Sequence, residues 1–284
     1  MSTQLRWGAR TYLMGILNVT PDSFSGDGLA LPERSTPEIV RVALAQASGF
    51  VESGAEILDV GGESTRPASV YGAHAEVDER AELGLALPVV EALVRELGDR
   101  AMVSIDTSKG AVARAALAAG ARMVNDVWGA RRDPGTADAA AAHDAYLVLM
   151  HNKEHAVYPD GVLPEVIGWL REAVEAALAR GVRRERLLVD PGIGFGKTGE
   201  HSLEVLRHLG ELRDALGLPL LVGTSRKRFI GELLGGVPPA ERVAGTATTV
   251  ALAIAAGADV VRVHDVAEIA RTVRVADAIV RGHS

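Results

Sequence analysis

Eight short apolar runs recur along the chain, and each ends at a residue that can carry charge, chelate or donate a hydrogen bond. A stretch with helical spacing follows each run, and this alternation predicts eight parallel strands with helices between them, a (β/α)8 or TIM barrel. The carboxyl ends of all strands gather at one face of such a barrel. We therefore expect polar residues that are distant in the sequence to form one site. The runs span residues Thr11–Asn18, Ile57–Asp59, Met102–Asp106, Met123–Asp126, Tyr146–His151, Leu187–Asp190, Leu220–Ser225 and Val260–His264.

Length and composition support one α/β domain over residues 1–284. A chain of 284 residues is close to the roughly 250 typical of this barrel. Hydrophobic residues make up 48% of the chain but aromatic residues only 4%, so Ala, Val, Leu and Ile must build the core, which suits buried parallel strands. Two connections, Val19 to about Thr36 and Gly61 to about Val77, are longer than ordinary βα loops, so long loops should follow strands 1 and 2.

Glycine ends most of the expected helices, as at Gly54, Gly98, Gly120, Gly181, Gly217 and Gly257, which is typical of a left-handed C-terminal cap. The Ala137–Ala142 run also favours a helix over disorder. Apolar spacing predicts further helices over Ile39–Ser53, Asp78–Leu97, Lys109–Ala119, Pro164–Arg180, His201–Leu216, Pro239–Ala256 and Ala267–Val280.

Composition excludes several classes of function. The chain has no cysteine, which removes disulfides, thiolate nucleophiles and Cys-based zinc sites. A formal net charge of −7 disfavours binding to nucleic acid or to an anionic membrane, and no run is long enough to span a bilayer. We expect a cytoplasmic protein. An anionic substrate would need a local cation cluster, for which the candidates at the strand ends are Arg66, Arg226, Lys227, Arg228, Arg262 and His264.

Two motifs after the first two strands could bind an anion and a metal. Residues 18–28 read NVTPDSFSGDG, in which the amide oxygen of Asn18 is a hard ligand that suits Mg²⁺. An ordinary Pro-Asp turn explains this motif equally well. Residues 59–67 read DVGGESTRP, where Gly61 and Gly62 allow close backbone approach and Thr65 and Arg66 could bind phosphoryl oxygens. Taken alone, that segment is more simply a surface loop.

Three further strand ends carry Asp106, Asn125 and Asp190. Such side chains can pair with the N–H edge of a heterocycle, because an ionised carboxylate accepts two parallel hydrogen bonds. Each alone could instead cap the following helix, but the three together, with Asp126 adjacent, favour a site. In the DPGIGFGK segment that starts at Asp190, the spacing does not fit a Walker phosphate loop, and Phe195 is better explained as an aromatic wall over a flat ligand.

The last two strand ends supply cations. Lys227, in GTSRKRF, could donate to a ring carbonyl or nitrogen. Arg262 and His264 are two residues apart on a strand and so point to the same side, where they could hold a diphosphate. A solvated cationic loop and a structural histidine are the alternatives.

These motifs, taken in order, resemble the dihydropteroate synthase family. The resemblance runs from about Thr11 to His264 and rests on MGILNVTPDSFSGDG, DVGGESTRP, SIDT, NDV, DPGIGFGK, GTSRKRFIG and RVHD. That family joins 6-hydroxymethyl-7,8-dihydropterin diphosphate to 4-aminobenzoate on the route to folate and is the sulfonamide target. The resemblance implies a transferase that releases diphosphate, and a homodimer.

The resemblance also implies roles for individual residues. Asn18 would bind Mg²⁺ near the diphosphate, and Asp106, Asp190 and Lys227 would be the catalytic side chains. One position departs from some relatives, because Arg228 stands where a serine often follows the loop lysine, and this puts aminobenzoate contacts there in doubt. The phosphate ligands would be Thr65, Arg262 and His264, the pterin ligands Asp106, Asn125, Asp190 and Lys227, and the aminobenzoate side Asp22, Phe24, Arg66, Pro67 and Phe195.

Two other functions remain open on the sequence. A barrel that binds a reduced pterin for methyl transfer would share the pterin-facing Asp and Asn, but it has no need of Asn18, Thr65, Arg262 and His264 to hold a diphosphate. A catalytically silent pterin-binding or scaffold protein would be expected to lose loop residues first, yet Asp22, Arg66 and Lys227 are present.

Overall fold

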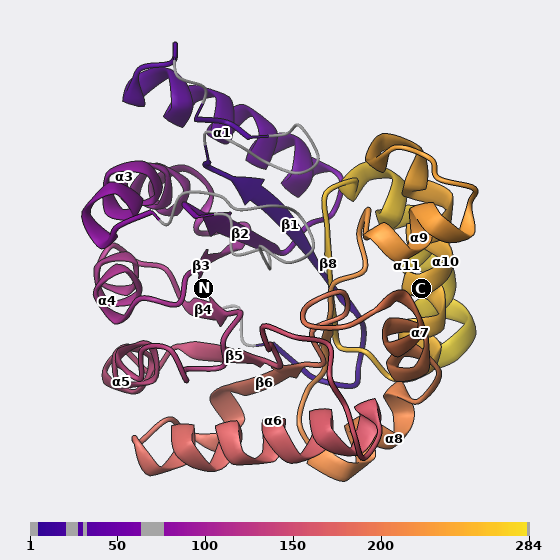
Figure 1. The fold of residues 1–284 in the computed structure, drawn as a ribbon. Helices are drawn as coiled ribbons and strands as arrows, with labels where there is room; N and C mark the ends of the chain where they lie inside the picture. Colours follow the sequence, from indigo (N-terminus) through magenta and orange to yellow (C-terminus); the bar gives the residue numbers. More distant parts are fainter. Residues whose placement is uncertain (1–4, 21–27, 31–32, 64–76, 283–284) are drawn as a thin grey trace.

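Eight parallel strands form an inner ring that is surrounded by helices (Figure 1). The computed structural model describes residues 5–20, 28–30, 33–63 and 77–282. Neighbouring strands follow the order β6-β5-β4-β3-β2-β1-β8-β7. A parallel bridge between Val189 and Leu220 joins the two ends of this order, and the N–H of Val189 donates to the carbonyl of Pro219 at 3.0 Å. The sheet therefore closes, and the predicted (β/α)8 barrel is confirmed.

The strands and helices alternate as expected from the sequence. The strands are β1 Tyr12–Asn18, β2 Ile57–Gly61, β3 Met102–Asp106, β4 Met123–Asp126, β5 Tyr146–Met150, β6 Leu187–Asp190, β7 Leu221–Val222 and β8 Val260–Val263. The α-helices are α1 Thr36–Glu52, α3 Glu79–Leu97, α4 Gly110–Ala118, α5 Gly135–Ala142, α6 Val162–Ala179, α7 Gly199–Arg207, α8 Leu209–Leu216, α9 Arg228–Leu233, α10 Val243–Ala255 and α11 Val266–Arg281. Two 3₁₀ helices, η1 Arg184–Arg186 and η2 Pro239–Arg242, precede β6 and α10.

Some helices differ from the sequence-based expectation. The stretch expected as one helix over His201–Leu216 is two helices, α7 and α8, which meet at His208 with φ −113° and ψ 20°. The apolar spacing does not predict the short helix α9. Gly98 caps α3 in the right-handed region, with φ −61°, so the left-handed cap expected there is wrong, whereas Gly217 adopts it with φ 58°.

Strand alternation divides the core into an inner and an outer part. Met14, Ile57 and Met102 lie at one level of neighbouring strands and belong to a buried cluster inside the barrel. Trp7, from the segment before β1, packs edge-to-face on Tyr12 at a centroid distance of 5.7 Å and so covers this cluster. The amino-terminal end of the barrel is therefore filled.

Close contact between strand and helix depends on one glycine. A Cβ added at Gly15 in β1 would lie 2.6 Å from Cδ2 of Phe50 in α1. Because a real Cβ essentially never comes that close, this position allows α1 to pack directly on the sheet.

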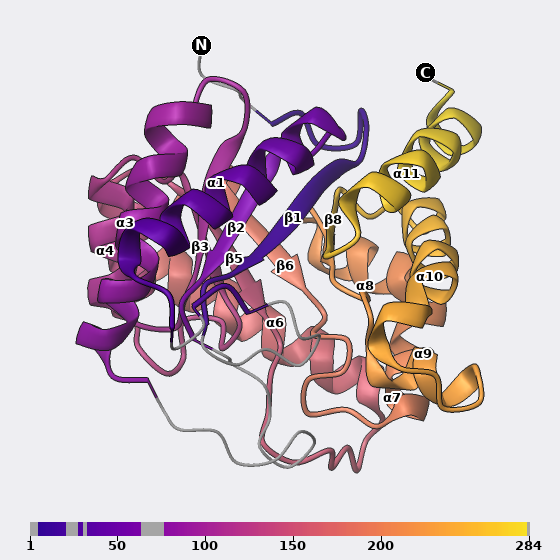
Figure 2. The same cartoon turned by 90° about the horizontal axis from the view of Figure 1, so that it is seen from above.

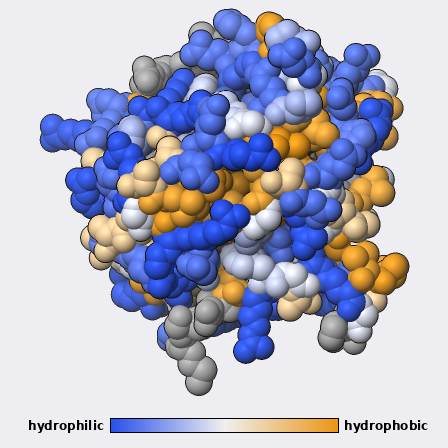
Figure 3. Space-filling model, turned by 90° about the horizontal axis from the view of Figure 1, so that it is seen from below, coloured by the Kyte–Doolittle hydropathy of each residue, from blue (hydrophilic) through white to orange (hydrophobic). Residues whose placement is uncertain are grey.

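The outer surface of the barrel differs from one side to another. In Figure 2, α7 and α9 lie at one end of the barrel and the end of α11 at the other. The face shown in Figure 3 is mostly hydrophilic, with apolar atoms in a band across it and at the right-hand edge. No helix among the described residues is both long and apolar enough to cross a membrane.

Candidate active site

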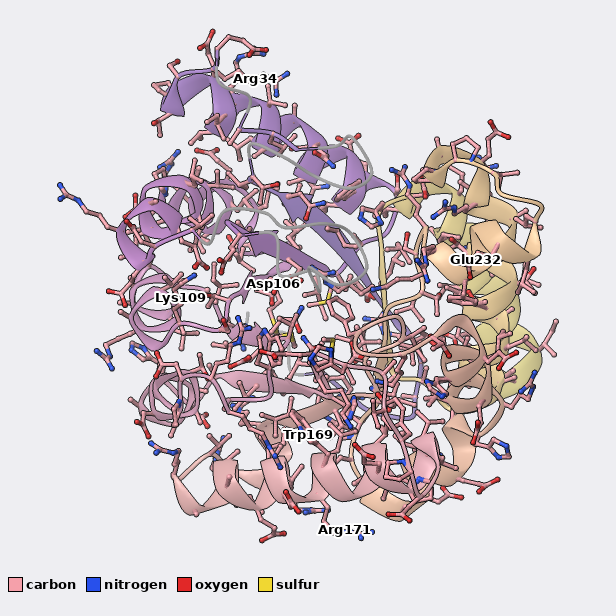
Figure 4. The ribbon with its side chains drawn as sticks, in the orientation of Figure 1. Arg34, Asp106, Lys109, Trp169, Arg171 and Glu232 are labelled. Carbon is pink, nitrogen blue, oxygen red and sulfur yellow. The ribbon has the colours of Figure 1, made fainter. Side chains whose placement is uncertain are left out.

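A cavity opens at the carboxyl ends of the strands, and eight of the residues that the sequence predicts for the site line it. They are Asn18, Asp106, Asn125, Asp190, Phe195, Lys227, Arg262 and His264. In Figure 4, Asp106 lies inside the ring of strands, whereas Arg34, Arg171 and Glu232 lie outside that ring, near the outer helices. The predicted residues Asp22, Phe24, Thr65, Arg66 and Pro67 lie outside the described residues.

Strand register explains why distant residues meet here. Gly61 in β2 is the register partner of Asp106 in β3, and Asp106 is the partner of Asn125 in β4. Residues at the same level of a closed sheet face the same interior space when their parity agrees. Arg262 and His264 are two residues apart at the end of β8 and both line the cavity, as their spacing predicts.

One partly buried arginine holds two carboxylates together at the cavity. Nε of Arg262 donates to Oδ2 of Asp59 at 2.6 Å, and Nη2 donates to Oδ2 of Asp106 at 2.7 Å. Nδ2 of Asn125 donates to the same Oδ2 of Asp59 at 3.0 Å. Asp59 thus orients both an arginine and an amide that line the cavity.

Burial raises the pKa values of the two carboxylates that line the cavity. It raises the pKa of Asp106; Arg262 opposes this effect and the charge of Asp59 adds to it. Burial also raises the pKa of Asp190 to about 6, against the hydrogen bond from Gly192 and the charge of Lys227. Oδ1 of Asp106 is buried without a hydrogen-bond partner among the described residues. A ligand donor at this oxygen would satisfy it.

The loop after β6 brings an aromatic ring to a lysine. Oδ1 of Asp190 accepts a hydrogen bond from the N–H of Gly192 at 2.7 Å, which starts the turn. Nζ of Lys227 lies 3.9 Å from the centroid of the Phe195 ring, a cation–π contact. Together these side chains form one wall of the cavity.

His264 is oriented by a serine of the preceding strand end. Oγ of Ser225 accepts from the N–H of His264 at 3.1 Å and lies 2.9 Å from its Nδ1. If the hydroxyl donates to Nδ1, the ring proton sits on Nε2 and can be donated to an anion. Arg262 and His264 together then offer donors on one side of the cavity.

The described residues provide no protein cage for a metal. No group of three or more His, Asp or Glu side chains among them could hold a metal ion. Asn18 lines the cavity together with His264 and Arg262. One amide oxygen near an anion site fits Mg²⁺, which keeps several waters and shares substrate phosphate oxygens rather than taking all its ligands from protein.

Several residues that looked like candidates lie elsewhere. Arg226 forms a bidentate ion pair with Asp265, at 2.9 and 2.5 Å, and Arg228 pairs with Glu232 on the surface, so neither joins the cation cluster that lines the cavity. Asp126 points out of the barrel and accepts from Oγ1 of Thr136 at 2.7 Å.

Gly62, one of the two glycines expected to let the backbone approach a ligand, packs against a helix. A Cβ on Gly62 would come within 3.0 Å of Cγ of Glu82 and 3.2 Å of Cβ of Ala86, both in α3. The space on the Cβ side of Gly62 is thus filled by a helix rather than by the cavity.

The sequence motifs do not by themselves assign a role to four residues of the site region. Asp59 and Ser225 orient cavity residues, Glu63 lines the cavity, and Lys197 supports the Phe195 loop. Alternation along β2 puts Asp59 on the inner face with Ile57, and this is the signal that could have identified it. Lys197 follows a strand end by seven positions and gives no comparable signal.

Comparisons with known proteins agree with this geometry. Residues 14–264 match the family described as pterin binding enzyme. The chain is 45% identical over 275 residues to the dihydropteroate synthase of Bacillus subtilis, covering 97% of this chain and 90% of that one. It superposes on the crystal structure of dihydropteroate synthase from Clostridium difficile in the presence of pteroic acid with a TM-score of 0.88, 44% identity and coverage of 97% and 98%. For the Xanthomonas albilineans dihydropteroate synthase with 4-aminobenzoic acid, the TM-score is 0.85, with 44% identity and coverage of 96% and 94%. This chain therefore belongs to the dihydropteroate synthases, within the family of pterin-binding enzymes.

Proposed function

We propose that this chain condenses 6-hydroxymethyl-7,8-dihydropterin diphosphate with 4-aminobenzoate, releasing diphosphate and forming 7,8-dihydropteroate. One observation carries the proposal: a single cavity combines the acceptors Asp106 and Asp190 with the donors Arg262 and His264. The acceptors suit the N–H edge of a heterocycle, and the donors suit an anionic tail. The solved relatives with pteroic acid and with 4-aminobenzoic acid carry ligands of the same chemical classes.

In this proposal the pterin lies against the inner strand ends. Asp190 accepts from ring N–H groups, Asn125 and Lys227 bind the remaining polar edge, and Oδ1 of Asp106 takes up a ring donor. This would satisfy the buried oxygen that has no partner among the described residues. Binding therefore removes an uncompensated buried acceptor as well as forming new contacts.

The diphosphate would bind on the cationic side of the cavity. Arg262 and His264 donate to its oxygens, and Thr65 is proposed as a third donor from the loop after β2. Asn18 would hold Mg²⁺ beside the diphosphate, and the metal would supply charge neutralisation for the leaving group when bound. The donor side thereby stabilises negative charge as it develops.

The reaction exchanges one bond at the exocyclic methylene. The C–O bond to the diphosphate breaks with its electron pair leaving on oxygen, the arylamine nitrogen forms the new C–N bond, and the amine then loses a proton. The electron-rich ring can spread positive charge, so early C–O cleavage is favourable, and the carboxylates Asp106 and Asp190 stabilise the cationic ring. No nucleophile from the protein is needed.

The aminobenzoate would approach along Phe195. Asp22, Phe24, Arg66 and Pro67 are proposed to complete its pocket. Arg228 is not part of this proposal, because it pairs with Glu232 through Nε at 3.1 Å and does not line the cavity.

A coupled diphosphate-release assay tests this function. The wild-type protein should release diphosphate only when both substrates are present. Lys227→Ala or Asp190→Asn should abolish turnover while the far-ultraviolet circular dichroism spectrum, which reports on folding, stays unchanged. Methyl transfer from a reduced pterin is the competing outcome. Methyl transfer without diphosphate release would replace the proposal, and full activity of both variants would remove the assigned roles.

We also propose a homodimer, formed through α10 and α11. Leu252 in α10 is 64% exposed, and Val275 and Ile279 in α11 are 60% and 78% exposed. Large apolar side chains gathered on two adjacent helices favour an interface. Sedimentation equilibrium should give twice the monomer mass, and Ile279→Glu should shift it to the monomer.

The cytoplasmic location remains a prediction.

A further inference from the structure

The turn that follows β6 is pressed against the backbone that leaves β5. A Cβ on Gly192 would lie 1.9 Å from the carbonyl oxygen of His151, and one on Gly196 would lie 2.2 Å from that of Lys153. The hydroxyl of Tyr158 donates to the carbonyl of Gly196 at 2.7 Å. The turn therefore fits its support without side chains in between.

A buried lysine sits at the centre of this turn. Lys197 is 5% exposed, and its Nζ lies 2.7 Å from Nδ1 of His151, 3.1 Å from the carbonyl oxygen of Gly192 and 3.2 Å from that of Phe195. An ammonium group has three N–H donors and no acceptor. All three donors thus have partners, and two of these partners are backbone carbonyls of the turn.

The histidine partner is held neutral. Burial lowers the pKa of His151 to about 2, and the charges of Lys197 and Lys153 act in the same direction. A neutral imidazole can accept at Nδ1, which is the role that Lys197 requires. His151 therefore completes the lysine site from the β5 side.

The same turn forms the wall of the cavity. Gly192 donates its N–H to Asp190, and a Cβ on Gly194 would lie 3.1 Å from Cδ of Lys227. The Phe195 ring covers Nζ of Lys227 at 3.9 Å. Lys197 does not line this cavity, so it can act on a ligand only through the turn.

We propose that Lys197, supported by His151, is a positioning residue that fixes the Phe195 turn for the incoming arylamine. This inference rests on the proposed function. Lys197 holds the carbonyls of Gly192 and Phe195. It thereby keeps the Phe195 ring and the ammonium group of Lys227 in one geometry. The pterin, which is bound mainly by the inner strand ends, depends less on it.

The charged groups around Lys197 make its protonation sensitive to the surroundings. Burial lowers the pKa of Lys197 to about 7; Asp190 opposes this shift, Lys227 and Lys153 add to it, and Glu165 opposes it. The ammonium form supplies all three donors, so a ligand that tightens the turn also favours this form.

A double-mutant cycle separates positioning from a purely structural role. Lys197→Met and Phe195→Ala should each raise KM for 4-aminobenzoate on the order of tenfold, because an imprecisely placed wall loses about that much. The double variant should be no worse than the poorer single variant, since both changes remove the same wall. Affinity for the pterin diphosphate should change less than about threefold in the lysine variant.

Lys153→Met is the matched control. The change removes a nearby positive charge. The ammonium group of Lys153 pairs with Glu165 and donates to the carbonyl of Val157, but not to the carbonyls of Gly192 or Phe195. Its KM for 4-aminobenzoate should stay within about threefold of wild type. Lys197→Gln keeps two N–H donors, so its KM for 4-aminobenzoate should lie between those of Lys197→Met and the wild type. This variant replaces Lys197→Met in the test if the latter does not fold.

Hydrogen exchange on the substrate-free protein tests, without any turnover, whether Lys197 fixes the turn after β6. Lys197→Met should speed exchange in residues 192–197 and leave the strands of the barrel unchanged. A wild-type protein that fails to turn over would count against the proposed function alone, because exchange still reports on the turn. Unchanged exchange in residues 192–197, or multiplicative effects in the double variant, would overturn the role of Lys197.

Discussion

Arg262 donates from Nη2 to Oδ2 of Asp106 at 2.7 Å, across 156 residues of sequence. The arginine comes from the end of β8 and the carboxylate from the end of β3, so only barrel closure brings them together. Asp59 shares the same guanidinium. Because Asp59 and Asp106 hold the guanidinium of Arg262 in place without a ligand, this cation is preorganised to bind an anion in the cavity.

Asp59 should matter for turnover without touching substrate. Asp59→Asn removes the charge that orients Arg262 and Asn125, and kcat/KM for the pterin diphosphate should fall on the order of 100-fold, as expected when reacting groups are misplaced. Steady-state kinetics of diphosphate release measure this effect.

Asp126→Asn is the control for that variant. Its carboxylate is equally buried but faces away from the cavity, where it accepts from Thr136, Trp128 and Ala130. The free energy of unfolding should fall by about 1–3 kcal/mol while kcat/KM per folded molecule stays constant. Equal kinetic losses in the two variants would contradict the role assigned to Asp59.

Pterin affinity should weaken in acid through Asp190. Burial raises the pKa of this carboxyl to about 6, and the ionised form is the one that accepts two ring N–H groups. Below about pH 6 the ligand must displace a proton, so Kd should rise about tenfold per pH unit, while above it this group contributes no slope. Calorimetric titration of 6-hydroxymethyl-7,8-dihydropterin measures the dependence.

Asp190→Asn isolates that group from Asp106, whose pKa is also raised. The variant should bind more weakly at neutral pH and lose the part of the acid slope that belongs to Asp190. A slope identical to that of the wild-type protein would show that another group titrates.

A glycine at the contact between β1 and α1 and a glycine on the exposed side of α1 should respond to alanine in opposite directions. Gly15→Ala places a Cβ 2.6 Å from Phe50 and should lower the free energy of unfolding by about 1–3 kcal/mol. Gly49 lies inside α1, and a Cβ added there would meet no atom within 4 Å, so Gly49→Ala should raise it by about 0.5–1 kcal/mol. Urea denaturation distinguishes them, and equal destabilisation of both would refute the packing argument.

Magnesium dependence should reveal the part played by Asn18. Asn18→Ala removes one oxygen ligand, so the Mg²⁺ concentration for half-maximal activity should rise on the order of tenfold. Asn18→Asp keeps an oxygen and should remain close to wild type. An unchanged Mg²⁺ requirement in the alanine variant would mean that Asn18 does not bind the metal.

Regular periodicity made most of the fold predictable from the sequence. Apolar runs such as Met102–Asp106 alternate with stretches such as Asp78–Leu97, and the structure has β3 and α3 there. The site followed from the same regularity, because strand ends of a barrel converge. Asp106, Asn125 and Asp190 could therefore be grouped from the sequence alone.

The rest depended on backbone geometry that periodicity does not encode. Arg226, Lys227 and Arg228 are three adjacent cations, yet Arg226 has φ 57° and its side chain turns to Asp265, while Arg228 begins a helix and faces Glu232. The break at His208 interrupts a stretch whose apolar spacing continues unbroken. Local turns of this kind are decided by tertiary contacts.

A crystal structure with 6-hydroxymethyl-7,8-dihydropterin diphosphate tests the central claim most directly. Our account predicts one molecule in the mouth of the barrel, its ring edge within hydrogen-bond distance of Asp106, Asn125 and Asp190 and its diphosphate on Arg262 and His264. A pterin bound elsewhere, or a diphosphate pointing away from Arg262, would contradict it.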